Sequence, residues 1–257
     1  MRDGIDWGSF TLFLYILMRM SGFVLFNPIF GRTGLPGLFK AGLILLLSIS
    51  VMSFYPGTAE VPGTTLELGL KLFLELGAGF LVATIMNLFF YVAELAGEVS
   101  DTQMGMSMAK TYDAGAQSSM TVTANLLRIL MILIFFAENG HLTLLRLMLT
   151  SGTLIPFGSA SLGNASANCV IQLFLECTIL GVKLCLPLLA AQLLGQIGMG
   201  ILMKVIPQIN VFAINMELKV LIGLGMLLLL ISPFTEFLLG VESTMLSEIQ
   251  QALSLMG

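Results

Sequence analysis

Long runs of apolar residues decide what this chain can fold into. Seven such runs follow one another between breaks made of glycine, proline and polar residues. A bilayer core offers the backbone no water to bond with, so membrane-spanning segments form helices or closed barrels, and runs this long favour helices. The sequence therefore predicts an all-α membrane protein. The approximate ranges of the runs are 10–30, 41–55, 72–93, 122–137, 142–157, 170–203 and 211–231.

Composition excludes a soluble domain and a nucleic-acid partner. Of 257 residues, 57% are hydrophobic and only 10% are charged, and the mean hydropathy is +0.98. Soluble domains carry about 25% charged residues. The net charge is −4 and the basic residues are scattered, so no basic patch for nucleic acid is expected. We also expect the first apolar run to stay in the mature chain, because no small-residue cleavage site follows it.

The lengths of the runs argue against a plain up-and-down bundle. A membrane span needs about 20 apolar residues. The second, fourth and fifth runs have only 15 or 16 residues, whereas the sixth has 34 and contains Pro187. Short runs are typical of helical hairpins packed against other protein, and a long helix is expected to kink at proline. We therefore expect long kinked helices and hairpins, packed in a helical assembly with other subunits.

Charged residues inside the apolar runs must face protein or water. An ionised side chain at the bilayer centre costs about 2.5 to 3.5 kcal/mol on insertion scales. Glu67, Lys71 and Glu75 are spaced for pairing along one helix, whereas Arg19 and Arg128 have no acid close by on their own segments. Pairing within the chain and contacts with partner subunits are both open for these groups. The predicted buried or interfacial charges are Arg19, Glu75, Arg128, Glu176, Lys183, Glu217 and Lys219.

The segment 101–121 differs from the apolar runs on either side of it. It contains two glycines, a Ser/Gln cluster and four methionines, and an acidic stripe of Glu94, Glu98 and Asp101 leads into it. That stripe is typical of a solvated helix end, and a water-filled vestibule is the alternative. Glycine gives a backbone freedom, and methionine makes adaptable apolar contacts. The composition suits a segment that seals and then moves.

No set of catalytic residues is recognisable. The single histidine, His141, leaves a His-based zinc site or a Ser/His/Asp triad incomplete. Cys169, Cys177 and Cys185 follow one another at intervals of eight, about 12 Å along a helix, which is too far for a disulfide. We expect these cysteines to be packing residues. The sequence predicts a protein that is not an enzyme and has no metal site and no cofactor.

Three stretches carry a resemblance to a known family. They are "FNPIFGRTGLPGLFKAGLILLLSIS" at 26–50, "AGEVSDTQMGMSMAKTYD" at 96–113 and "VIPQINVFAINMELKVLIGL" at 205–224. In order and spacing they resemble the FliR/SctT family of type III secretion export-gate subunits, and the resemblance covers nearly the whole chain. The third stretch is the most specific, with Pro207, Gln208, Asn210 and Phe212 between two apolar helices. Ala114 stands where the family tends to have proline, after Asp113.

The resemblance implies a core subunit of a protein export gate in the bacterial inner membrane, at the flagellar basal body. One such chain joins several copies of FliP and FliQ around a channel for unfolded flagellar proteins, with FlhB and FlhA attached. It also implies a single domain in which residues 1–165 are FliP-like and residues 166–257 form a FliQ-like helical hairpin. A subunit of a virulence injectisome is the alternative within the family.

The resemblance also assigns the site residues. It places the loop at 104–120 inside the assembly as a plug of the resting channel, and the signature Pro207, Gln208, Asn210 and Phe212 on a hairpin near the cytoplasmic entrance. Two rival hypotheses stand outside the family: an ion-coupled small-solute carrier that uses Glu75, Glu176 and Lys183, and a structural scaffold without a channel. The predicted plug residues are Met104, Gly105, Met106, Met108, Lys110, Tyr112, Gly115 and Met120.

Overall fold

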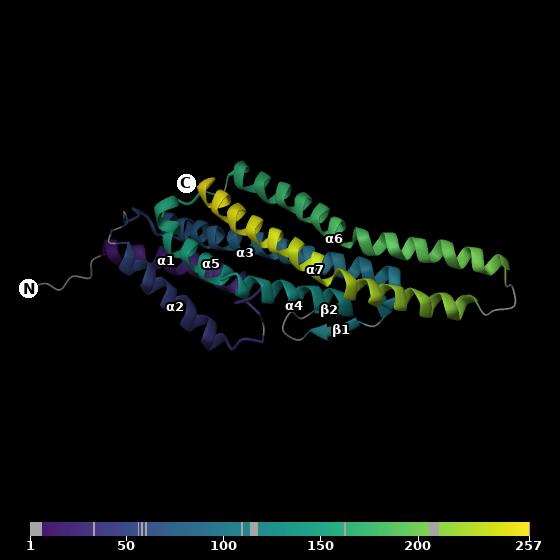
Figure 1. Ribbon diagram of the computed structural model, residues 1–257. Helices are drawn as coiled ribbons and strands as arrows, with labels where there is room; N and C mark the ends of the chain where they lie inside the picture. The colour runs from purple at the N-terminus through teal and green to yellow at the C-terminus, as the bar shows by residue number, and fades with distance from the viewer. Residues whose placement is uncertain are drawn as a thin grey trace, which may run out of the picture. The chain divides into compact units, whose positions relative to one another are not determined.

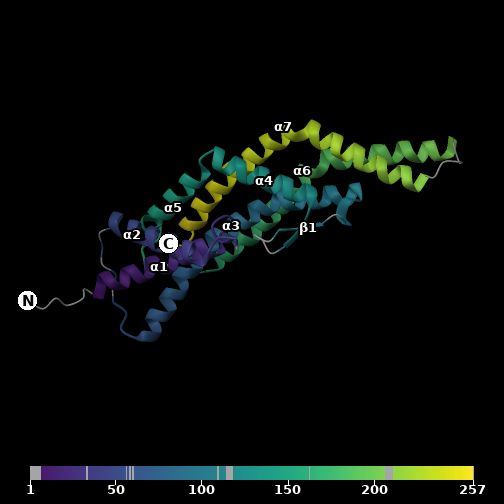
Figure 2. The ribbon, with the colours of Figure 1, turned by 90° about the horizontal axis from the view of Figure 1, so that it is seen from below.

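Helices dominate the chain, as the apolar runs predict (Figures 1 and 2). The structure is a computed structural model that describes residues 7–32, 34–55, 57, 59, 61–108, 110–113, 118–161, 163–205 and 211–256. The helices are α1 (Trp7–Phe26), α2 (Gly37–Phe54), α3 (Thr65–Met104), α4 (Val122–Ala137), α5 (Gly140–Leu154), α6 (Asn164–Val205) and α7 (Val211–Ser254).

The all-α membrane class is confirmed. Among the described residues, five helices are long and apolar enough to cross a membrane, and α4 with α5, bent by 67° at the break, counts as a sixth span if the pair crosses together. Each apolar run of the sequence coincides with one helix. Two helices extend well beyond their runs: α3 continues to Met104 and α7 continues to Ser254.

The chain forms two compact units, and three helices contribute to both. The first unit holds residues 1–88, 139–174 and 244–257. In it α1 packs against α2, and α2 contacts α5. The backbones of α1 and α3 nearly touch, because a β-carbon on Gly22 would overlap the Leu76 carbonyl oxygen and one on Gly79 would overlap the Arg19 carbonyl. This close crossing brings side chains of α1 and α3 within reach of each other.

The second unit holds residues 89–138 and 175–243. In it the later part of α3 packs against α6 and α7: Leu95 lies on Gly181, and Met104 lies on Gly223. The two long helices α6 and α7 run beside each other, and Gln192 donates a hydrogen bond to the Lys219 carbonyl at 2.7 Å (Figure 1). Their connection lies at residues 206–210, outside the described residues.

One element of the second unit was not predicted. Between α3 and α4 the chain forms a short 3₁₀ turn (Met106–Met108) and then two antiparallel strands, β1 (Lys110–Asp113) and β2 (Ser118–Thr121). The register pairs Lys110 with Thr121 and Thr111 with Met120. Strand β2 and the start of α4 are neighbours (Figure 1). The expected loop is therefore a β-hairpin, which we call the 105–121 hairpin.

Candidate functional site

The 105–121 hairpin emerges from a firmly joined pair of helices. Glu94, Gly97 and Asp101 lie on one face of α3, at intervals of three and four residues. They meet Arg128, Ala124 and Thr123 of α4, so the two helices pair in opposite directions. A β-carbon on Gly97 would overlap the backbone of Ala124, and only glycine permits this approach. We call these six residues the α3–α4 frame.

Asp101 caps helix α4 from a different helix. The first N–H groups of a helix lack partners within the helix, and they are usually capped by the residue before it. That residue, Thr121, makes no capping bond with its side chain. Instead Asp101 accepts a 2.7 Å bond from the Thr123 N–H and a 2.5 Å bond from the Thr123 hydroxyl. Asp101 is fully buried, so the predicted solvated end of the acidic stripe is wrong for this residue.

Arg128 contacts Glu94 and Met120 of the same chain. Its Nε lies 3.3 Å from Oε1 of Glu94, as an ion pair without hydrogen-bond alignment. Its Nη1 donates to Sδ of Met120 at 3.4 Å. The side chain is only 8% exposed, so the guanidinium bridges α3, α4 and β2 away from solvent. Of the two alternatives left open for Arg128, the structure shows pairing within the chain, and the acid lies on another helix.

The predicted plug residues divide between the hairpin and its support. Met104 ends α3, is fully buried and lies against Gly223, and Met120 is 6% exposed. Both methionines are therefore anchors at the ends of the segment. Gly105 has φ +75° and open space around its α-carbon, which marks a turn at the exit from α3. Of the remaining predicted residues, Met106 is partly buried, Met108 ends the 3₁₀ turn, Lys110 and Tyr112 lie on β1, and Gly115 is outside the described residues.

The first unit contains a second buried charge network, centred on Arg19 and Glu75. The Arg19 Nε lies 2.6 Å from the Glu75 Oε2, and neither side chain is exposed. The Arg19 Nη1 also donates to the Ser151 hydroxyl at 3.3 Å and to the Ile155 carbonyl at 3.1 Å. The other Glu75 oxygen accepts a 2.7 Å bond from the Gly158 N–H. The network joins α1, α3 and α5 to the turn after α5.

This network shows which of the pairings left open by the sequence Arg19 and Glu75 make. Arg19 pairs with an acid 56 residues away, so it does not need a partner subunit for neutralisation. Glu75 pairs with Arg19 and does not complete the predicted row with Lys71, which pairs with Glu67 at 3.0 Å. The close crossing at Gly22 and Gly79 explains both results, because it places α1 against the face of α3 that carries Glu75.

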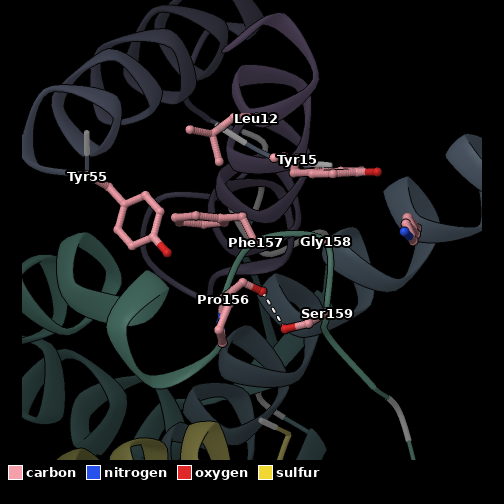
Figure 3. A pocket seen from close by; sticks show the side chains of 9 residues that line it. Leu12, Tyr15, Tyr55, Pro156, Phe157, Gly158 and Ser159 are labelled. Atoms are coloured by element: carbon pink, nitrogen blue, oxygen red, sulfur yellow. Dashed lines mark hydrogen bonds between the residues drawn. The ribbon is translucent and has the colours of Figure 1, made fainter. Parts of the chain in front are cut away.

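A cavity of about 280 Å³ lies beside this network (Figure 3). Phe157 lines the cavity and also lies 4.3 Å from the Arg19 guanidinium, and Gly158 lines it while bonding to Glu75. Tyr55 packs edge-on against Phe157, with ring centres 5.4 Å apart. The hydroxyl of Ser159 bonds back to the Pro156 carbonyl at 2.7 Å (Figure 3). The turn that lines the cavity is therefore held by the buried pair.

The other predicted charges lie on the surface of the long helices. Glu176 and Lys183 of α6 and Glu217 of α7 are exposed, and Lys219 is partly buried. Among the described residues, no ion pair joins Glu176 to Lys183. Of the signature residues, Phe212 lies in the first turn of α7, and Pro207, Gln208 and Asn210 are outside the described residues.

Comparison with known proteins identifies the family of this chain. The profile described as bacterial export proteins, family 1, matches residues 10–244. The chain belongs to this family. The matched range includes most of α1, the whole of the segment between α3 and α4, and most of α7. The resemblance to FliR and SctT proteins seen in the sequence is confirmed.

Relatives of this export family come from several bacteria. The flagellar biosynthetic protein FliR of Escherichia coli K12 is 26% identical, over 97% of each chain. The FliR of Pectobacterium carotovorum is 29% identical over 98% of this chain and 97% of its own. The Yop proteins translocation protein T of Yersinia pestis is 27% identical over 84% of each chain. These two flagellar relatives align over more of the chain than the Yersinia protein does.

Proposed function

We propose that this chain is a core subunit of the flagellar type III protein export gate in the bacterial inner membrane, at the basal body. It assembles with several copies of FliP and FliQ, and with FlhB and FlhA, around a channel for unfolded flagellar proteins. The 105–121 hairpin plugs the closed channel. Family membership and the names of the flagellar relatives support the export role.

The observation that carries the plug assignment is the contrast between the hairpin and its support. The α3–α4 frame is joined by a close backbone contact, a buried cap and an ion pair. The chain nevertheless leaves this frame at Gly105 and returns at Thr121. A segment inserted between two fastened helices can change position without unfolding them, as a gate requires. The composition of the hairpin, which is rich in methionine, serine and glycine, also suits a segment that changes position.

Exposed charges on α6 and α7 support an assembly. Glu176 lies between exposed apolar residues, including Phe174 and Leu175, on a helix with the length and hydropathy of a membrane span. A charge on a lipid-facing surface is costly. The charge is accommodated if partner subunits or channel water cover this face. We therefore infer that the exposed charges Glu176, Lys183 and Glu217 contact partners or water.

We also propose that the chain combines a FliP-like part and a FliQ-like part. The proposed boundary at residues 165 and 166 falls at the beginning of α6, and the long helices α6 and α7 supply the two arms of the FliQ-like hairpin. In this proposal the signature residues at 207–212 connect the arms near the cytoplasmic entrance.

A small-solute carrier has less support. Both oxygens of Glu75 are already bonded, one to Arg19 and one to Gly158, and the carboxylate is fully buried. Glu75 therefore has no oxygen that lacks a protein partner. Purified chain reconstituted alone should show no solute uptake.

Deletion of residues 105–118 tests the proposed function. The variant is coexpressed with FliP and FliQ, and the native mass of the purified complex and the ion conductance of the membrane are measured. We expect an intact complex and a raised conductance, because the frame remains while the plug is lost. A Gly/Ser segment of equal length is the matched control for chain continuity, and it should leak as well. Wild-type conductance in a correctly assembled deletion complex would refute the plug.

A further inference from the structure

The contacts of the α3–α4 frame differ in the elements that they join. Gly97 and Asp101 join α3 to α4 only, through Ala124 and Thr123. Arg128 also reaches the hairpin, because its Nη1 donates to the sulfur of Met120 in strand β2. Met120 is in register with Thr111, so a displacement of β2 also displaces β1.

We propose that Arg128 is the positioning residue of the closed hairpin. This inference rests on the proposed plug function and adds the residue that holds the plug. Glu94 fixes the guanidinium from α3, and the guanidinium fixes β2 through Met120. When β2 leaves its place, Arg128 loses one of the two partners that it has among the described residues, in a site that is only 8% exposed. Burying a charge with fewer partners is unfavourable, so Arg128 favours the closed position.

The opposite end of the hairpin is built differently. Gly105 leaves α3 with φ +75°, and a β-carbon there would meet no atom of the described residues within 4 Å. A glycine in open space permits rotation of the chain. The hairpin is therefore held by Arg128 at its return strand and free to turn at its exit from α3. Opening begins with the separation of β2 from Arg128, while Asp101 keeps the first turn of α4 capped.

The test compares Arg128→Gln with wild type in the complex with FliP and FliQ. Two quantities are measured: membrane conductance, and the rate of tryptic cleavage after Lys110 in β1. A contact of this kind contributes about 1 kcal/mol, so we expect cleavage about fivefold faster. The membrane conductance of Arg128→Gln should also be higher than that of wild type. Arg146→Gln, which removes an exposed arginine of α5, is the matched control and should change neither quantity.

Two further variants separate positioning from general support of the fold. Met120→Leu keeps the size of the side chain but removes the sulfur acceptor, and it should raise cleavage and conductance to a smaller extent. The exchange Glu94→Arg with Arg128→Glu restores the ion pair but leaves no donor at position 128. We expect the exchanged variant to remain leaky. Full recovery of wild-type behaviour would overturn the inference, since the ion pair alone would then suffice.

The outcomes distinguish this inference from the proposed function. The deletion of 105–118 can raise the conductance while Arg128→Gln keeps the conductance and the cleavage rate of wild type. In that case the plug function is supported and the positioning role of Arg128 is refuted. If the deletion has no effect on conductance, the plug itself fails. The tryptic cleavage rate then still decides whether Arg128 holds the hairpin in place.

Discussion

Removing Glu75 should destabilise the first unit more than any surface substitution. In Glu75→Leu the Arg19 cation stays at a position with no exposure but loses its only acid in the network, 2.6 Å away. Breaking a buried pair from one side typically costs about 3 to 5 kcal/mol. Ser151, the Ile155 carbonyl and the Phe157 ring still contact the guanidinium. These contacts offset part of the loss, so we expect a value of about 3 kcal/mol.

Thermal unfolding in mild detergent, monitored by the helical signal in circular dichroism, measures this loss of stability. For chains of about this size, 1 kcal/mol shifts Tm by roughly 2 to 4 °C, so the expected fall is roughly 6 to 12 °C. Glu67→Gln is the matched control on the same helix. It breaks the partly exposed pair with Lys71, and Tm should not change measurably.

A double variant decides whether the effect comes from an unpaired charge. Arg19→Met with Glu75→Leu removes both charges, and replacing a whole buried pair with apolar groups is often close to neutral. We therefore expect the double variant to be more stable than either single variant. If its loss equals the sum of the two single losses, the residues act independently and the reasoning fails.

Two further predictions concern Asp101 and the signature residues Gln208 and Asn210. Asp101→Ala should cost about 2 kcal/mol, because it leaves the Thr123 N–H without its cap, and thermal unfolding of the complex measures this; an unchanged Tm would show that Asp101 does not cap α4. Replacing Gln208 and Asn210 by alanine should reduce protein export without lowering the amount of chain in the membrane, as immunoblotting and a secretion assay would show. Equal losses of export and abundance would instead assign these residues to folding.

The helices were predictable because their signal is local. An apolar run of sufficient length is helical in a membrane whatever it packs against, and each run coincides with one helix. Hydropathy did not predict the C-terminal end of α3, although the spacing of the acidic stripe indicated a helix there. The residues after position 93 include Glu94 and Asp101, which hydropathy places outside a span. They remain helical because Arg128 and Thr123 satisfy them from another helix.

The spacing of residues in the sequence could not identify the partners of the buried charges. Spacing along a helix finds pairs three or four residues apart, such as Glu67 and Lys71. Arg19 meets Glu75 only because Gly22 and Gly79 allow two backbones to cross closely. Glycine in an apolar run gives no hydropathy signal for such a crossing. The two arginines were therefore interpreted as possible subunit contacts.

The sequence of the hairpin contains a pattern typical of two strands and a turn, but its composition was interpreted differently. Thr111, Tyr112 and Thr121 are residue types that favour strands, and Gly115 lies between the two strand sequences. The methionines and glycines of the segment indicated adaptability instead. Both descriptions apply, to different parts: Met104 and Met120 are buried anchors, whereas β1 and β2 pair as antiparallel strands. The proposed gate needs this division, because a movable seal has to be attached to helices that do not move. The buried polar contacts of the α3–α4 frame supply the attachment, and Gly105 supplies the turn.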